Sequence, residues 1–187
     1  MGNVKHKVIT MTRLQSAVDN VRLELDQMGV WNDRLAVIDV YLTWFGKDYG
    51  WQWYRGSGHI EIPAFSVARL NEWISGDPRW TLRNLLRHEY GHAVADTNRA
   101  LIRSRRFADA FGTPHDSEIP NDYSPDEHVT EYAATDACED FAEVFRFYLK
   151  HSGKIPRRYG TGIIRRKWRF VDRLCTCIAS GKRRWEA

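Results

Sequence analysis

Two histidines enclose a glutamate in the segment His88-Glu89-Tyr90-Gly91-His92. On a helix, residues four apart lie one turn above each other, so both imidazoles can reach one metal ion. Glu89 is turned by about 100° from His88, which places its carboxylate beside such an ion. Zinc held in this way lowers the pKa of a bound water, and the neighbouring carboxylate can take the proton as general base. The segment predicts one zinc ion per chain and hydrolytic chemistry, although roughly one chain in a hundred of this composition carries the pattern by chance.

A third protein ligand is needed, because catalytic zinc is held by three protein groups and keeps a fourth position open. The metzincin pattern would supply that ligand nearby, but it requires Gly at Ala95 and His at Asn98. A thermolysin-like spacing would place the ligand about twenty residues after His92, where no suitable side chain stands. His115 and His128 are two candidates, in or at the edge of an acidic loop.

The segment 137–145 (ACEDFAEVF) offers another candidate, Glu139. Glu139 and Glu143 are four residues apart, so they share one face of a helix whose other face is apolar. One carboxylate can bind the metal ion while the other holds a histidine ligand in place. A solvated acidic face is the alternative interpretation. Beside a helical H-E-x-x-H segment the metal interpretation is favoured, with Glu139 as the third ligand.

Three segments together resemble a known family. They are His88–Ala95 (HEYGHAVA), Phe107–Phe111 (FADAF) and Glu139–Glu143 (EDFAE), the last preceded by Tyr132. They are similar to the catalytic domain of anthrax lethal factor and, more broadly, to zinc metallopeptidases of gluzincin type. The resemblance covers roughly residues 80–150, without a departure at these positions, and leaves the C-terminal tail unmatched.

The resemblance implies a zincin-like fold and the hydrolysis of peptide bonds in a peptide or protein substrate. It implies three zinc ligands, which are His88, His92 and Glu139. Glu89 would be the catalytic base, Tyr132 would help to stabilise the oxyanion, and Glu143 would support a ligand. Tyr132 as an ordinary core aromatic is the alternative. The large docking surface of lethal factor has no room in this chain, so the identity of the substrate does not carry over.

The elements that must position these residues follow from hydrophobic periodicity and turn signals. We expect helices over about 12–28, 64–74, 77–96, 100–111, the second half of 128–151, and 164–180. We expect strands over 35–45, 49–55 and 59–62, and a loop over 112–127. The predicted fold class is α+β, a single domain over 1–187 in which a small twisted sheet packs on the helix that carries the histidines.

The segment His59-Ile60-Glu61-Ile62 is a candidate for substrate binding. Pro63 follows it and suits the end of a strand at a sheet edge, because proline cannot donate to a ladder. An edge strand can pair with an extended peptide, which would bring a substrate across the site. An ordinary sheet edge without a ligand is the alternative.

The composition limits the class of protein. The chain has 187 residues, of which 43% are hydrophobic and 28% charged, as in a globular domain. No apolar run approaches the roughly 20 residues that span a bilayer, and the N-terminus does not read as a secretory signal. Three cysteines are too few for a disulfide framework and favour a reducing compartment. We therefore expect a cytoplasmic protein, or one exported without a recognisable signal.

Charge is distributed unevenly along the chain. Residues 151–187 hold eleven Lys and Arg against two acidic residues, whereas 109–143 hold eleven Asp and Glu and no Lys or Arg. The basic segment could meet nucleic acid or an acidic membrane surface, or it could neutralise the acidic stretch or be solvated. The alternative function is therefore a nucleic-acid-binding module with a non-catalytic zinc site.

Overall fold

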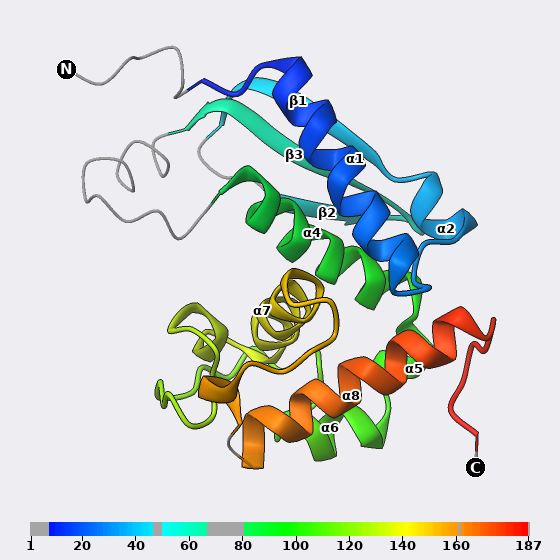
Figure 1. The fold of residues 1–187 in the computed structure, drawn as a ribbon, viewed down its shortest axis with the longest axis vertical. Helices are drawn as coiled ribbons and strands as arrows, with labels where there is room; N and C mark the ends of the chain where they lie inside the picture. Colours follow the sequence, from blue (N-terminus) through cyan, green and yellow to red (C-terminus); the bar gives the residue numbers. More distant parts are fainter. Residues whose placement is uncertain (1–7, 47–49, 67–80, 161, 187) are drawn as a thin grey trace.

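The computed structural model of the chain describes residues 8–46, 50–66, 81–160 and 162–186. Within these ranges seven α-helices accompany a three-stranded sheet, so the predicted α+β class is confirmed (Figure 1). The helices are α1 (Met11–Gln27), α2 (Asp33–Ala36), α4 (Leu82–Thr97), α5 (Arg99–Ile102), α6 (Arg105–Phe111), α7 (Ala137–Lys150) and α8 (Gly162–Ala179). The strands are β1 (Asp39–Gly46), β2 (Gly50–Tyr54) and β3 (Ser57–Ser66).

The first helix forms where the sequence predicts it. The Thr10 side chain caps α1 by accepting from the backbone N–H of Arg13, and its buried face is apolar, with Leu14, Val18, Val21 and Leu25. This face packs on α4 and against β1. Glu24 also accepts two hydrogen bonds from Arg87 of α4, at 2.7 and 2.6 Å, so α1 and α4 are joined by both apolar and ionic contacts.

Two strands of the sheet have bounds that differ from the predicted ones. The strand expected over 35–45 begins only at Asp39, because the Asn32 side chain caps a short helix by accepting from two backbone N–H groups. The strand expected over 59–62 does not end before Pro63, since β3 runs from Ser57 to Ser66. The helix expected over 64–74 lies mostly outside the described residues, and its first residues, up to Ser66, belong to β3 instead. The helix expected over 77–96 begins only at Leu82, because Thr81 is extended and caps it.

The strand order is β1-β3-β2, with β1 parallel and β2 antiparallel to β3. β3 is therefore the central strand, and the prediction that 59–62 forms a sheet edge is wrong. Tyr54 and Ser57 flank a two-residue turn and form the first hydrogen-bonded pair of the β2–β3 ladder. Because every second residue of a strand directs its backbone groups to the same neighbour, the nitrogen of Pro63 also points towards β2. In the described residues β2 pairs with β3 only as far as Glu61, so proline removes no hydrogen bond from that ladder.

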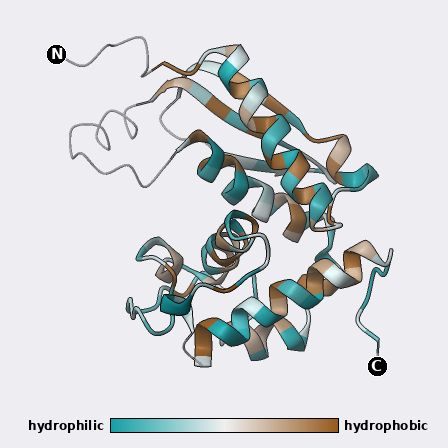
Figure 2. Ribbon diagram, in the orientation of Figure 1, coloured by the Kyte–Doolittle hydropathy of each residue, from teal (hydrophilic) through white to brown (hydrophobic). Residues whose placement is uncertain are grey.

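The C-terminal helices form a second layer beneath α4 (Figure 1). α7 packs directly on α4 at Gly91, where an added Cβ would lie 3.1 Å from the Cα of Ala142. Glycine is needed here for the close approach of the two backbones. α8 covers α6 and α7, and apolar and polar residues alternate along it as in an amphipathic helix (Figure 2).

The acidic loop and the lack of a long apolar segment were also predicted from the sequence. The acidic stretch over 112–127 contains no helix or strand, as predicted. Over the described ranges, no helix combines the length and the apolar character that crossing a bilayer requires.

Candidate metal centre

α4 places the two histidines as their spacing predicts. The helix begins after Thr81, whose side chain accepts from the backbone N–H of Asn84, and it runs without interruption through His88 and His92. The Nε2 atoms of the two imidazoles lie 3.1 Å apart. His88 is buried and His92 is partly buried, so the pair lies at a boundary between the core and solvent.

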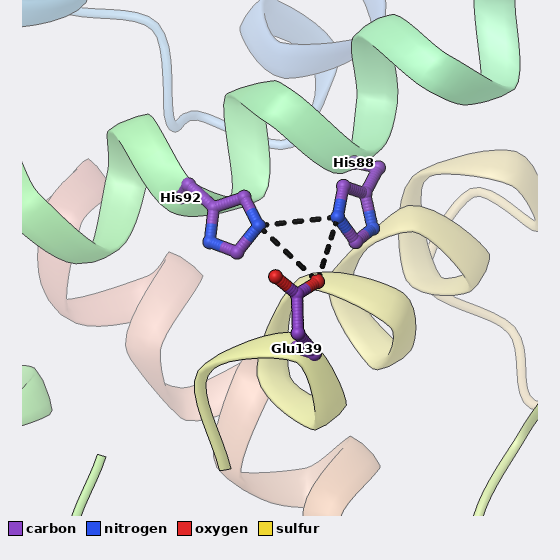
Figure 3. Close-up of side chains that lie close together, drawn as sticks. All are labelled: His88, His92 and Glu139. Carbon is purple, nitrogen blue, oxygen red and sulfur yellow. Dashed lines mark hydrogen bonds and ion pairs between the residues drawn. The ribbon is translucent and has the colours of Figure 1, made fainter. Parts of the chain in front are cut away.

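Glu139 reaches the same point from α7. Asp136 caps that helix by accepting from the backbone N–H of Glu139 at 2.8 Å, which places Glu139 in the first turn. Its Oε2 lies 3.0 Å from His88 Nε2 and 3.5 Å from His92 Nε2 (Figure 3). The third ligand predicted from the sequence therefore meets the two histidines.

The three atoms have the spacing that a zinc ion requires. Ligand atoms about 2.0–2.1 Å from a tetrahedral ion lie about 3.3 Å from one another, and the three separations here are 3.0, 3.1 and 3.5 Å. Glu139 Oε2 is buried and makes no hydrogen bond of good geometry, although His88 is close. Within the described ranges this is the one group of three His, Cys or acidic residues whose ligand atoms converge so closely. The donor set fits zinc.

The two other histidines considered as ligands lie elsewhere. The ring of His115 packs edge-on against Phe107, and burial lowers its pKa to about 4. His128 is buried, and its Nδ1 accepts from the backbone N–H of Ser124 at 3.3 Å. Neither histidine belongs to the converging group, so the structure favours Glu139 over both.

Glu143 holds His88 from the opposite side of the ring. Its Oε1 lies 3.0 Å from His88 Nδ1, and its side chain is 0% exposed. Arg146 donates two hydrogen bonds of 2.7 Å to its oxygens, and Thr130 donates another at 2.7 Å. Burial alone would raise the pKa of Glu143, but the contacts with His88 and Arg146 lower it to about 2. The acidic residues of this helix therefore do not form a solvated face.

Two supporting residues were not identified from the sequence, namely Arg146 and Thr130. Arg146 stands three residues after Glu143, a spacing that brings opposite charges together on a helix, so a local signal existed. Thr130 lies in a loop and its contact depends on the tertiary fold. A third missed residue is Cys138, whose Sγ lies 3.2 Å from His92 Nδ1. Burial raises the pKa of this thiol, so it contacts the ring as a neutral group.

The carboxylate of Glu89 lies between α4 and β2. It is 4% exposed, and its Oε2 accepts from the backbone N–H of Trp51 at 2.7 Å. Burial raises the pKa of Glu89, although the nearby histidines oppose the shift. A carboxylate with a raised pKa is better matched to the work of a general base near neutral pH. The Trp51 indole also donates to Asp96 at 2.8 Å, which ties β2 to the same helix.

Tyr132 lies beside His88 rather than in the core. It begins a short 3-10 helix, Tyr132–Ala134, and its ring centroid is 5.7 Å from that of His88. The residue is 45% exposed. The alternative of an ordinary core aromatic is therefore wrong, because Tyr132 lies at the surface next to His88.

The residues predicted to bind substrate, His59, Ile60 and Glu61, do not form a free edge. All three lie in the central strand β3, between β1 and β2. Ile60 is buried, and His59 pairs with the carboxylate of Glu61 at 3.1 Å. Among the strands, β2 makes the larger contact with α4, and the prediction that 59–62 offers a free edge to a substrate is wrong.

Comparisons of the chain with known protein families, with curated proteins and with solved structures found no match.

Proposed function

We propose that this protein is a zinc-dependent peptidase of gluzincin type with a zincin-like arrangement of sheet and helices. The observation that carries the proposal is the convergence of His88, His92 and Glu139 on one point, with Glu89 turned to its side. Zinc bound by these three residues would polarise the scissile carbonyl and acidify the attacking water.

The chain's own residues supply the remaining steps. Glu89 accepts the proton of the attacking water and delivers it to the leaving amine, which suits its buried carboxylate. Tyr132 donates a hydrogen bond to the oxyanion as the carbonyl becomes tetrahedral. Glu143 accepts from His88 Nδ1–H and so fixes the tautomer that leaves Nε2 free to bind metal.

β2 is the strand that an extended substrate would join. Its inner edge pairs with β3, and alternation of the ladder directs the N–H and C=O groups of Trp51 and Trp53 to the outer edge. The Trp51 N–H reaches Glu89, so this outer edge faces the proposed base. A peptide added there would pass beside Glu89 and would pair with outward backbone groups of β2 other than the Trp51 N–H, which already donates to Glu89.

A structural zinc site is less well supported. Structural zinc is normally enclosed by four protein ligands, whereas the group found among the described residues contains three. An open fourth position is what hydrolysis requires. This difference favours the peptidase over a binding module that merely contains zinc.

Hydrolysis of a peptide library tests the proposal directly. The protein loaded with zinc should cleave a subset of the peptides, a strong chelator should abolish cleavage, and added zinc should restore it. Mass spectrometry of the products identifies the cleaved bonds. A zinc-loaded protein that cleaves no peptide of a broad library, alongside an active control peptidase, would contradict the proposal.

Tyr132→Phe should reduce peptide turnover roughly ten- to a thousandfold while zinc content and thermal stability stay unchanged. The substitution removes only the phenolic hydroxyl and leaves the ring beside His88. Steady-state kinetics and metal analysis provide the measurement. Tyr123→Phe is a matched control, because Tyr123 is another exposed tyrosine, and its activity should remain at the wild-type level. Wild-type turnover in Tyr132→Phe would exclude an oxyanion role.

A further inference from the structure

A hollow lies between α6, α8 and the C-terminal segment, and four arginines are among the eight residues that line it. Arg106 comes from α6, and Arg166, Arg169 and Arg173 come from α8. The hollow has a volume of about 480 Å³, and Trp185 of the C-terminal segment closes one side. None of its lining residues is a candidate metal ligand, so it is separate from the site described above.

The helix presents three of these arginines as a row. Positions 166, 169 and 173 follow the i, i+3, i+7 spacing, so they share one face of α8 and extend over about 10 Å of its axis. All three are exposed. Arg106 lines the same hollow from α6, so arginines of two helices contribute to it.

These charges are not neutralised by the protein itself. None of the four guanidinium groups forms an ion pair with any residue in the described ranges. Asp109 also lines the hollow, but its nearest cationic partner is Arg105, at 3.9 Å. Lys167 behaves differently, because it is buried and pairs with Asp140 at 2.6 Å. The expected neutralisation of the acidic stretch by the basic tail thus applies to Lys167 and not to this row.

Two of the arginines are held in place by backbone carbonyls. Arg166 Nε donates to the carbonyl of Ala110 at 3.2 Å, and Arg106 donates to that of Glu186 at 2.8 Å. The Arg106 guanidinium also lies 5.3 Å from the centre of the Trp185 ring. The Trp185 indole N–H in turn donates to the carbonyl of Leu101 in α5 at 2.8 Å and lies 3.1 Å from Oγ of Ser104, the residue that caps α6, which anchors the C-terminal segment at the junction of these two helices. These contacts orient the positive groups without cancelling their charge.

We propose that this hollow binds the phosphodiester backbone of a nucleic acid. Guanidinium groups match phosphate oxygens with paired hydrogen bonds. A row about 10 Å long is too extended for one phosphate, whereas a duplex strand carries a phosphate about every 3.4 Å of its axis. Carboxylates of an acidic peptide carry their charge at irregular positions, so the evenly spaced row of arginines fits the regular backbone of a nucleic acid better. The binding is independent of base sequence, since backbone contacts carry no sequence information.

Fluorescence anisotropy with a labelled DNA duplex of mixed sequence tests this assignment. Binding should be measurable at low salt and should weaken as salt is added. A plot of log K against log salt concentration should be linear, and each phosphate contacted should contribute about −0.9 to its slope. The double variant Arg169→Gln/Arg173→Gln should bind about tenfold more weakly, with a slope smaller by about 1.8. Circular dichroism and thermal melting should match the wild type, because both side chains are exposed.

The double variant Arg157→Gln/Arg158→Gln is the matched control. It removes the same charge from exposed positions of the same basic segment, outside the hollow. Its affinity should stay within about twofold of the wild type. Equal weakening in the two double variants would show that net charge rather than the hollow determines binding, and would overturn the proposal. No binding at low salt, or displacement of the DNA by poly-glutamate at equal charge concentration, would also overturn it.

Discussion

Glu89→Gln should lower peptide hydrolysis by about 10²- to 10⁴-fold while the protein still binds one zinc ion per chain. Glutamine keeps the size of the side chain and can still accept from the Trp51 N–H through its amide oxygen. It cannot take a proton from water, so only general-base assistance is removed. Steady-state kinetics with a peptide from the library and metal analysis of the same sample measure both quantities.

Glu118→Gln is a suitable control for that variant, because it makes the same chemical change at an exposed position of the acidic loop. It should retain wild-type activity and wild-type zinc content. Undiminished hydrolysis in Glu89→Gln would show that the mechanism assigned to this carboxylate is wrong, even in a protein that contains zinc. Loss of zinc from Glu89→Gln would instead assign Glu89 a role in holding the metal.

Glu139→Ala should lose both its zinc, after dialysis against a mild chelator, and its peptidase activity. Two imidazoles alone hold zinc poorly, and the substitution removes the only carboxylate oxygen of the converging group. His115→Ala and His128→Ala are the controls, because each removes an imidazole that lies outside this group. Both should keep one zinc ion per chain, as measured by metal analysis, once circular dichroism has shown that they are folded.

A different outcome would move the third ligand. If Glu139→Ala retained its zinc and His115→Ala lost it, the metal would have to be held from the aromatic cluster around Phe107. Circular dichroism of His115→Ala would separate this outcome from general destabilisation, and His88→Ala is the positive control, since His88 is a ligand in either case. That variant should lose zinc together with activity.

The sequence by itself determined the parts of the site that depend on local geometry. His88 and His92 must share a helical face because the period of an α-helix is a local property of the backbone. The pairing of Glu139 with Glu143 follows from the same rule, and the resemblance to gluzincin-type peptidases assigned each of them a role that their positions fit. The α+β class followed in the same way from the periods of the apolar residues.

The tertiary structure alone decided which distant segments meet. Strand order depends on competition among all possible pairings, so no local signal showed that β3 is central or that β2 reaches Glu89 through Trp51. Pro63 suggested an edge strand because proline has no N–H to donate to a neighbouring strand. The sequence does not show that β2 stops pairing with β3 at Glu61, before it reaches Pro63. The hydrogen bond from Thr130 to Glu143 also depends on the tertiary structure, and so does the row of arginines on α8, which has no acidic partner in the part of the chain that the structure describes. Contacts between residues far apart in sequence depend on how the apolar faces of helices and strands pack together. That packing cannot be deduced from local patterns in a single sequence.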